Sequence, residues 1–148
     1  MKKKLFAALL VAAAFTSNSY AQLRQIPSIV TDSFAKKYPG AANVAWADKV
    51  TGFEASFNLN EHKQHVTFTS KGATKKTDMS LAIAEVPATV IDGFQKSKYN
   101  AWEIISYEYV TETPNKIYYR IYVQKNDWVR KYLYFTKKGQ LAKDGLTL

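Results

Sequence analysis

The sequence contains no cysteine, and this absence removes several kinds of chemistry at once. Disulfide bonds and thiolate chemistry are excluded, and so is a lipid anchor attached to a cysteine behind a leader. The stability of the folded chain must therefore come from an ordinary hydrophobic core.

Long apolar runs are also scarce, since the one clear example lies at the start of the chain. Three lysines at positions 2–4 precede the run Leu5–Phe15, and Ser19 and Ala21 supply small residues for cleavage. This pattern is typical of an export signal, because the run is too short for a stable transmembrane helix. We expect residues 1–21 to be a signal peptide, with an amphipathic or membrane-anchoring helix as the alternative. The expected location is periplasmic or secreted.

Acidic residues are few, because 12 Asp and Glu stand against 21 Lys and Arg, which gives a formal charge of +9. Three of the lysines lie in the expected signal peptide, so the mature chain carries about +6. Nucleic acid would attract such charge, but export separates the two, and no nucleic-acid motif is present. The charge suits an acidic protein surface or an envelope polyanion, or it serves solubility alone.

Two phrases in the chain share one pattern: "IPSIVTDSF" from Ile26 to Phe34 and "VPATVIDGF" from Val86 to Phe94. Their apolar residues recur every four positions, which places them on one face of a helix. Each phrase also has proline as its second residue, where the first helical turn needs no N–H. The phrases predict two amphipathic helices that each begin a repeat and end near "KKYPG" and "KSKYN".

After each predicted helix, apolar residues alternate with polar ones, as in antiparallel strands with one buried side. Turn-forming segments separate these stretches, and we expect residues after Gly72 and Gly139 to add a weaker last strand to each repeat. The predicted inward residues are Val44, Trp46, Phe53, Ala55, Phe57, Leu59, Val66 and Phe68 in the first repeat, and Ile105, Tyr107, Tyr109, Ile117, Tyr119, Ile121, Val123, Val129, Leu133 and Phe135 in the second.

The predicted fold class is therefore α+β, built from two tandem helix-plus-antiparallel-strand repeats over residues 26–84 and 85–146. A unit of roughly 60 residues buries too little apolar surface to be more than marginally stable alone. Residues 79–86 ("MSLAIAEV") also lack the composition of a linker. We expect a single domain over residues 22–148, with both helices on one face of a shared sheet.

These features resemble a known family. The leader, the "KYPGA" segment, the "VAW" strand and the "FTSKG" and "FTKKG" hairpins are similar to the PepSY-like, β-lactamase-inhibitor-like family of exported bacterial proteins. The resemblance covers essentially all of residues 22–148. It implies a fold like that of the β-lactamase inhibitor protein and a place in the Gram-negative envelope. It brings no catalytic residues, and it does not imply that this chain inhibits a β-lactamase.

Candidate metal ligands are limited to two histidines. His62 and His65, in "NEHKQHV", lie three positions apart where a turn passes into a strand, so their side chains point in different directions. No third ligand is apparent beyond Glu61 beside them. We expect a solvated hairpin tip, no metal and no cofactor.

Catalytic patterns are weak as well. Ser33 to Lys36 ("SFAK") matches the S-x-x-K of penicillin-recognising serine enzymes, but neither S-D-N nor K-T-G is present. Glu54 and Glu108 lie on predicted strands, yet nothing predicts that they are desolvated together as an acid–base pair. The glycines are dispersed at turns and form no phosphate-binding loop. The sequence therefore predicts that the protein is not an enzyme.

The two repeats differ on the side of the sheet that faces away from the helices. Tyr, Trp and Arg are enriched at the energetic centres of protein interfaces, whereas aromatic residues also stabilise exposed sheets through cross-strand pairs. The outward positions are Glu54, Ser56, Asn58, His65, Thr67 and Thr69 in the first repeat, with Gln124 and the predicted partner-binding residues Tyr118, Arg120, Tyr122, Trp128, Arg130, Tyr132 and Tyr134 in the second.

The sequence thus predicts a non-catalytic exported binding module, with a protein or peptidase inhibitor as one form of it. The expected partner is a protein or peptide in the cell envelope. The alternative is a structural or small-ligand-binding envelope protein that uses the groove between helices and sheet.

Overall fold

The structure is a computed structural model that describes residues 24–146. The expected signal peptide, residues 1–21, lies outside the described residues. Within residues 24–146, no helix has the length and apolar character needed to cross a membrane. The elements are α1 (Ser28–Lys37), β1 (Ala42–Lys49), β2 (Gly52–Leu59), β3 (His62–Phe68), β4 (Thr74–Leu81), the 3-10 helix η1 (Ile83–Glu85), α2 (Ala88–Gln95), β5 (Glu103–Glu112), β6 (Lys116–Asn126), β7 (Val129–Phe135) and β8 (Leu141–Leu146).

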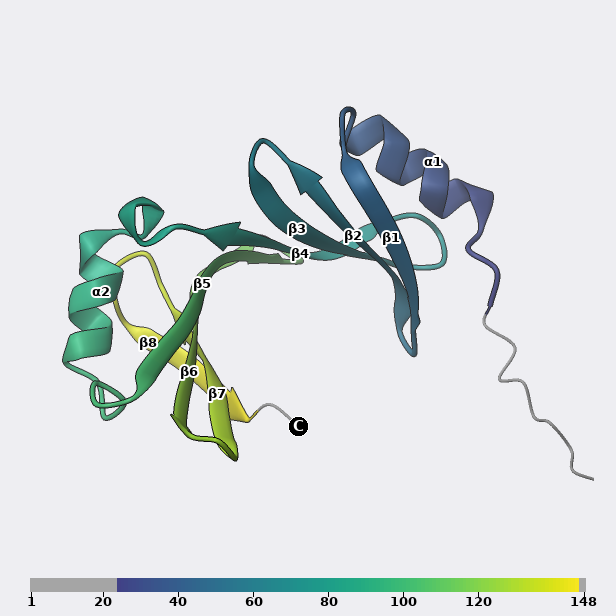
Figure 1. The fold of residues 1–148 in the computed structure, drawn as a ribbon. Helices are drawn as coiled ribbons and strands as arrows, with labels where there is room; N and C mark the ends of the chain where they lie inside the picture. Colours follow the sequence, from purple (N-terminus) through teal and green to yellow (C-terminus); the bar gives the residue numbers. More distant parts are fainter. Residues whose placement is uncertain (1–23, 147–148) are drawn as a thin grey trace, which may run out of the picture.

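The eight strands form one antiparallel sheet in which each strand pairs with its neighbours in sequence. Strand β4 pairs with β5 from Lys76, opposite Glu112, to Leu81, opposite Tyr107. The sheet therefore passes without a break from β1 at one edge to β8 at the other (Figure 1). We refer to residues 28–81 as the N-terminal half and to residues 88–146 as the C-terminal half.

The predicted α+β class, with tandem helix-plus-strand repeats, is wrong, because the described chain is mostly β. The two α-helices have only 10 and 8 residues, whereas β5 and β6 alone have 10 and 11. Helix α1 ends at Lys37, and after Tyr38 the chain continues with Pro39 and with Gly40, whose φ is 87°. Local periodicity locates elements, but the class depends on how much of the chain each type occupies and on how the strands join into one sheet.

The two helices begin in the same way. The carbonyl oxygen of Pro27 accepts a hydrogen bond from the N–H of Val30, and that of Pro87 accepts one from Val90, each at 2.9 Å. Val30 and Val90 are both fully buried. The proline thus fixes the start of each helix one turn before its first core residue.

Each helix covers its own hydrophobic core, and Figure 1 shows the two helices over separate parts of the sheet. Because burial of apolar surface is the main favourable term in folding, these two clusters hold the helices in place. The N-terminal core contains Val30, Phe34, Phe53, Ala55, Phe57, Val66 and Phe68, and the C-terminal core contains Val86, Val90, Phe94, Tyr99, Ile121, Val123, Leu133 and Phe135.

Both cores lie on the same side of the sheet. Residues directly opposite each other on neighbouring strands share a face. Phe57 of β2 is linked in this way, through successive partners on β3, β4, β5 and β6, to Phe135 of β7. The opposite side of the sheet, which neither α-helix covers, is called the open face below.

Three of the predicted inward residues are exposed instead. The strand register shifts between Ala42 and Ala45 and again between Ile104 and Ser106, so that Val44 and Ile105 leave the regular alternation. Their exposed fractions are 39% and 44%. Ile117, at 48%, lies at the start of β6 beyond either core. The register shifts near Val44 and Ile105 each add one residue to a strand, and they cannot be located from alternation alone.

Candidate functional site

The open face of the C-terminal half is built from β5, β6, β7 and β8, whose alternate side chains share it. Cross-strand pairing sets these side chains in rows. One row consists of Glu108, Arg120, Tyr134 and Lys143, and the next consists of Ser106, Tyr122, Tyr132 and Gly145.

The four tyrosines of this face pack in pairs. The rings of Tyr122 and Tyr132 stack with their centres 4.6 Å apart, and those of Tyr118 and Tyr134 meet edge to face at 5.8 Å. Such pairs stabilise a protein by about 0.5–1.5 kcal/mol beyond their buried area. All four side chains are only half-buried, so each also presents ring surface to solvent.

Arg120 lies beneath these rings and is only 7% exposed. Its Nε donates a hydrogen bond to Glu108, and its Nη2 lies 3.1 Å from Oδ1 of Asp78. The guanidinium also lies 4.5 Å from the ring centre of Tyr132. Its charge is therefore balanced within the protein, which corrects the expectation of a free Arg120 that meets a partner.

The protonation of this centre follows from its contacts. Burial alone would lower the pKa of Arg120, but the hydrogen bond to Glu108 and the charge of Asp78 outweigh it and raise the pKa above its ordinary value. Burial also raises the pKa of the Tyr132 phenol, while the nearby charge of Arg120 opposes that rise. Arg120 is thus a permanent cation, and Tyr132 is a neutral hydrogen-bonding group at neutral pH.

Asp78 joins the two halves, because it lies on β4 whereas Arg120 lies on β6. Its Oδ1 lies close to Nη2 of Arg120 and also 3.0 Å from Nζ of Lys76. Neither contact is aligned as a hydrogen bond, so both are ion pairs. The buried carboxylate therefore depends on two cations for its compensation.

Lys143 of the edge strand β8 packs against the group of four tyrosines Tyr118, Tyr122, Tyr132 and Tyr134, which we call the aromatic group, on the side of Tyr134 away from Arg120. Its Nζ lies 4.3 Å from the ring centre of Tyr134 and 4.9 Å from that of Tyr118. The same Nζ donates to Glu112 at 3.0 Å. Cation–π contacts of this kind hold the rings in fixed orientations.

Trp128 and Arg130 lie beyond Tyr122 and Tyr132, toward the end of the β6–β7 hairpin. Trp128 is 90% exposed and belongs to the turn between β6 and β7. The side-chain oxygen of Asn126 accepts hydrogen bonds from the backbone N–H groups of Trp128 and Val129, which shapes the turn. Arg130 is exposed and pairs across the strands with Gln124. Of the predicted residues, the structure brings together Tyr118, Arg120, Tyr122, Tyr132 and Tyr134, and it places Trp128 and Arg130 at the end of the hairpin.

Small polar residues and charged residues line the open face of the N-terminal half. Oγ of Ser56 and Nδ1 of His65 are hydrogen-bonded at 2.8 Å, and Asp78 is the cross-strand partner of His65. This row has the residue types of a catalytic triad, but the carboxylate of Asp78 is held by Arg120 and Lys76. The Ser56–His65 contact is therefore a structural hydrogen bond between strands.

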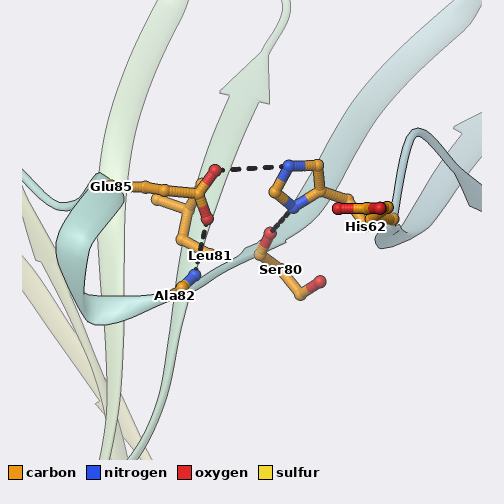
Figure 2. A pocket seen from close by; sticks show the side chains of 6 residues that line it. His62, Ser80, Leu81, Ala82 and Glu85 are labelled. Carbon is orange, nitrogen blue, oxygen red and sulfur yellow. Dashed lines mark hydrogen bonds and ion pairs between the residues drawn. The ribbon is translucent and has the colours of Figure 1, made fainter.

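His62 faces a pocket of about 410 Å³ where β3, β4 and η1 meet (Figure 2). Its Nδ1 lies 2.8 Å from the carbonyl oxygen of Ser80, and its Nε2 lies 3.3 Å from Glu85. The same carboxylate accepts a hydrogen bond from the N–H of Ala82. Within residues 24–146, no three His, Cys, Asp or Glu side chains gather in an arrangement that could hold a metal ion. The pocket lies beside η1 and not in a groove between an α-helix and the sheet.

The remaining catalytic candidates have other partners. Oγ of Ser33 donates a hydrogen bond to the carbonyl oxygen of Ile29 within α1. Glu54 forms an ion pair with Lys49 at 3.3 Å, while Glu108 bonds to Arg120. Strands β3 and β4 lie between the two glutamates, so these carboxylates do not form a pair.

The residues that sequence reasoning missed are the charged partners of the aromatic group: Asp78, Glu112 and Lys143. The alternation of β5 places Glu108 and Glu112 on the side of the sheet that bears Tyr118, so their face could have been predicted. Their partners depend on the register across four strands, for which the sequence carries no local signal.

Similarity to known proteins is found at the level of structure. No protein-family model matches the chain, and no curated protein matches it significantly. A presumed periplasmic protein from Bacteroides eggerthii is 25% identical, with a TM-score of 0.75 over 83% of this chain and 90% of that one. A DUF2874 family protein from Bacteroides ovatus is also 25% identical, with a TM-score of 0.75 over 83% and 89%.

A BLIP-like protein from Bacteroides fragilis is similar as well. It is 22% identical, with a TM-score of 0.74 over 86% of this chain and 90% of that one. Together these likenesses show that this chain has a BLIP-like fold. A PepSY-like relationship, which the sequence motifs suggested, is not shown.

Proposed function

We propose that this chain is a non-catalytic binding module that binds a protein through the open face of its C-terminal half. The observation that carries the proposal is the group of half-buried tyrosines on a side of the sheet that neither α-helix covers. Large rings fixed by Arg120 and Lys143 lose little conformational freedom when a partner covers them. Rigid aromatic groups of this kind are typical of interface centres.

Trp128 supports the same proposal. A tryptophan that is 90% exposed at a turn gains almost nothing for the fold from its indole ring. Asn126 nevertheless holds the turn that displays it. The ring is therefore better explained as a contact residue than as part of the core.

The similar structures favour binding over catalysis and a periplasmic location. One of them is a presumed periplasmic protein and another is BLIP-like. The export pattern of residues 1–21 agrees with a periplasmic location. An inhibitor of a protein or peptidase is the form of binding that a BLIP-like fold suggests.

The test compares two variants with their parent. A photo-reactive amino acid at position 128 captures the partner in the cell envelope, and the purified partner is then titrated with each variant. The combined Tyr122→Ala and Trp128→Ala protein should bind at least about 30-fold more weakly, which corresponds to about 2 kcal/mol. Its stability should fall by about 1–3 kcal/mol, because one ring pair and the buried part of the Tyr122 ring are lost.

The control is the combined Ser56→Ala and Thr67→Ala protein, whose changes lie on the open face of the N-terminal half. It should bind the partner within about twofold of the parent. If the aromatic double variant folds and binds with unchanged affinity, the C-terminal open face is not the binding site. If the double variant unfolds, the single Trp128→Ala protein answers the question, because this exposed residue contributes little to the fold.

A further inference from the structure

On the open face, the carboxylates have partners within the described residues, whereas some of the cations have none. Each of its carboxylates has a partner within the described residues: Glu54 contacts Lys49, Asp78 contacts Lys76 and Arg120, Glu103 accepts from Gln124, Glu108 contacts Arg120, and Glu112 contacts Lys143. A basic partner would therefore have to displace an existing cation or amide from every carboxylate on this face.

The cations of the same face outnumber its carboxylates. Lys63, Lys116 and Arg130 are exposed and form no ion pair within residues 24–146. Each belongs to the open face by alternation, since Lys63 is opposite Asn58, Lys116 is opposite Glu112, and Arg130 is opposite Gln124. The charge that remains available to a partner on this face is therefore positive.

Two of these cations bracket the tyrosines. Along β6, Lys116 lies two residues before Tyr118, and along β7, Arg130 lies two residues before Tyr132. Because alternate residues share a face, each cation is the neighbour of a tyrosine on its own strand. The strands run antiparallel, so Lys116 and Arg130 lie at opposite ends of the aromatic group. An aromatic centre between charged ends matches the usual core and rim of a protein interface.

We propose that the open face binds an acidic polypeptide, whose Asp and Glu side chains meet Lys116 and Arg130 on either side of the tyrosines. This rests on the proposed function and adds the chemistry of the partner. A neutral partner would bury Lys116 and Arg130 without compensation, which costs free energy. An acidic partner compensates both charges, breaks no existing ion pair, and is attracted over a distance by the net positive charge.

The test uses three labelled peptides of equal length that alternate Tyr with Asp, Tyr with Ser, or Tyr with Lys. Each is titrated into the protein comprising residues 22–148 while NMR follows the backbone amides. We expect the Asp peptide to bind most tightly, to shift the signals of Tyr122 and Tyr132, and to bind more weakly as salt is added. Changing Lys116 and Arg130 together to Glu should weaken it about tenfold or more.

The matched control changes Lys36 and Lys138 together to Glu, which alters the net charge equally on α1 and in the β7–β8 turn. This variant should bind the Asp peptide within about threefold of the parent. An equal loss in both variants would show general charge attraction and would overturn the proposal. The proposal would also be overturned if inorganic polyphosphate bound the same residues more tightly than the Asp peptide, since the site would then be one for polyanions.

Two further outcomes separate this inference from the proposed function. If the Ser peptide shifts Tyr122 and Tyr132 as strongly as the Asp peptide, the face binds polypeptides without preferring acidic ones, so only the inference fails. If no peptide shifts the signals of the open face, and the captured partner is unaffected by the Tyr122→Ala and Trp128→Ala changes, both fail.

Discussion

Phe34 of α1 and Phe94 of α2 occupy the same place in their halves, but they have different surroundings. The ring of Phe34 lies 5.3 Å from that of Trp46 and 5.0 Å from that of Phe57, in each case edge to face. Phe94 packs in a cluster whose sheet side includes the aliphatic Ile121. The same layout of a short helix on a sheet is thus reached with aromatic contacts in one half and largely aliphatic contacts in the other.

The two halves also differ in how closely the helix approaches the glycine turn that packs against it. A Cβ atom placed on Gly93 of α2 would lie 2.0 Å from the carbonyl oxygen of Gly139, so the two backbones touch. Ser33, at the matching position of α1, carries a side chain that bonds to its own helix. A turn glycine also approaches α1, because a Cβ atom on Gly72 would lie 2.7 Å from the carbonyl oxygen of Ile29. The approach between helix and turn is therefore closer in the C-terminal half, while the N-terminal half adds more ring contacts.

The open faces differ more than the cores. Ser56, Asn58 and Thr67 occupy the N-terminal half, whereas Tyr118, Tyr122 and the other tyrosines occupy the C-terminal half. Core packing restricts which residues can be exchanged, whereas exchanges at solvent-facing positions usually change stability by less than about 0.5 kcal/mol. This contrast is the reason to assign binding to the C-terminal half.

The largest effects should come from emptying the two cores. Phe34→Ala and Phe94→Ala should each lower the free energy of unfolding by about 3–5 kcal/mol, because both rings are buried. Phe34 should be the costlier of the two by about 1 kcal/mol, since its edge-to-face contacts are lost as well. Urea denaturation measures both, with Ile29→Ala, a half-exposed position on α1, as the control. Equal costs would show that the aromatic contacts add nothing.

A smaller effect should follow from a single added methyl group on α2. Gly93→Ala should cost about 1–3 kcal/mol net, although alanine favours the helix, because the new Cβ overlaps the backbone at Gly139. Ser33→Ala in α1 removes only a local hydrogen bond and should cost about 1 kcal/mol or less. Thermal unfolding of the two variants compares them directly. A neutral Gly93→Ala would mean that the close approach in the C-terminal half does not exist.

The smallest effect concerns a carboxylate on each edge strand. The hydrogen bond from Arg24 lowers the pKa of Asp48 on β1, and the hydrogen bond from Tyr99, assisted by Lys131, lowers the pKa of Asp144 on β8. Both pKa values lie below the unfolded value of about 3.8, so the stabilisation is present above pH 3.8 and is lost as the pH falls through the folded values.

Replacing either carboxylate by an amide should therefore reduce the fall in the free energy of unfolding at acid pH. Asp144→Asn should have the larger effect, because the buried Tyr99 loses a charged acceptor. Denaturation at a series of pH values between about 2 and 7 measures this. Asp127→Asn, in the exposed β6–β7 turn, is the control. An unchanged curve for Asp144→Asn would show that the Tyr99 contact does not form in solution.

Periodicity in the sequence located the helices and most strands, but it failed where contacts are distant. The four-residue spacing around Phe34 and Phe94 predicted both helices, while the α+β class drawn from them was wrong, because the helices are short and the strands form one long sheet. Arg120 was expected to be exposed by alternation. Its burial comes from Asp78, 42 positions away, and from Glu108 and Tyr132 on the strands at either side, which only the register brings together.

The two edges of the sheet have a consequence for how this chain behaves when it is concentrated. An unpaired edge strand can add to the edge of another copy and so begin aggregation. On β1, the register shift after Ala42 and the positive φ of Asn43, 54°, interrupt the row of backbone groups that a second copy would need. On β8, Lys143 and Asp144 place charges along a strand of only six residues. Both features disfavour edge-to-edge pairing between copies, so we expect this protein to resist joining into fibres when it is concentrated.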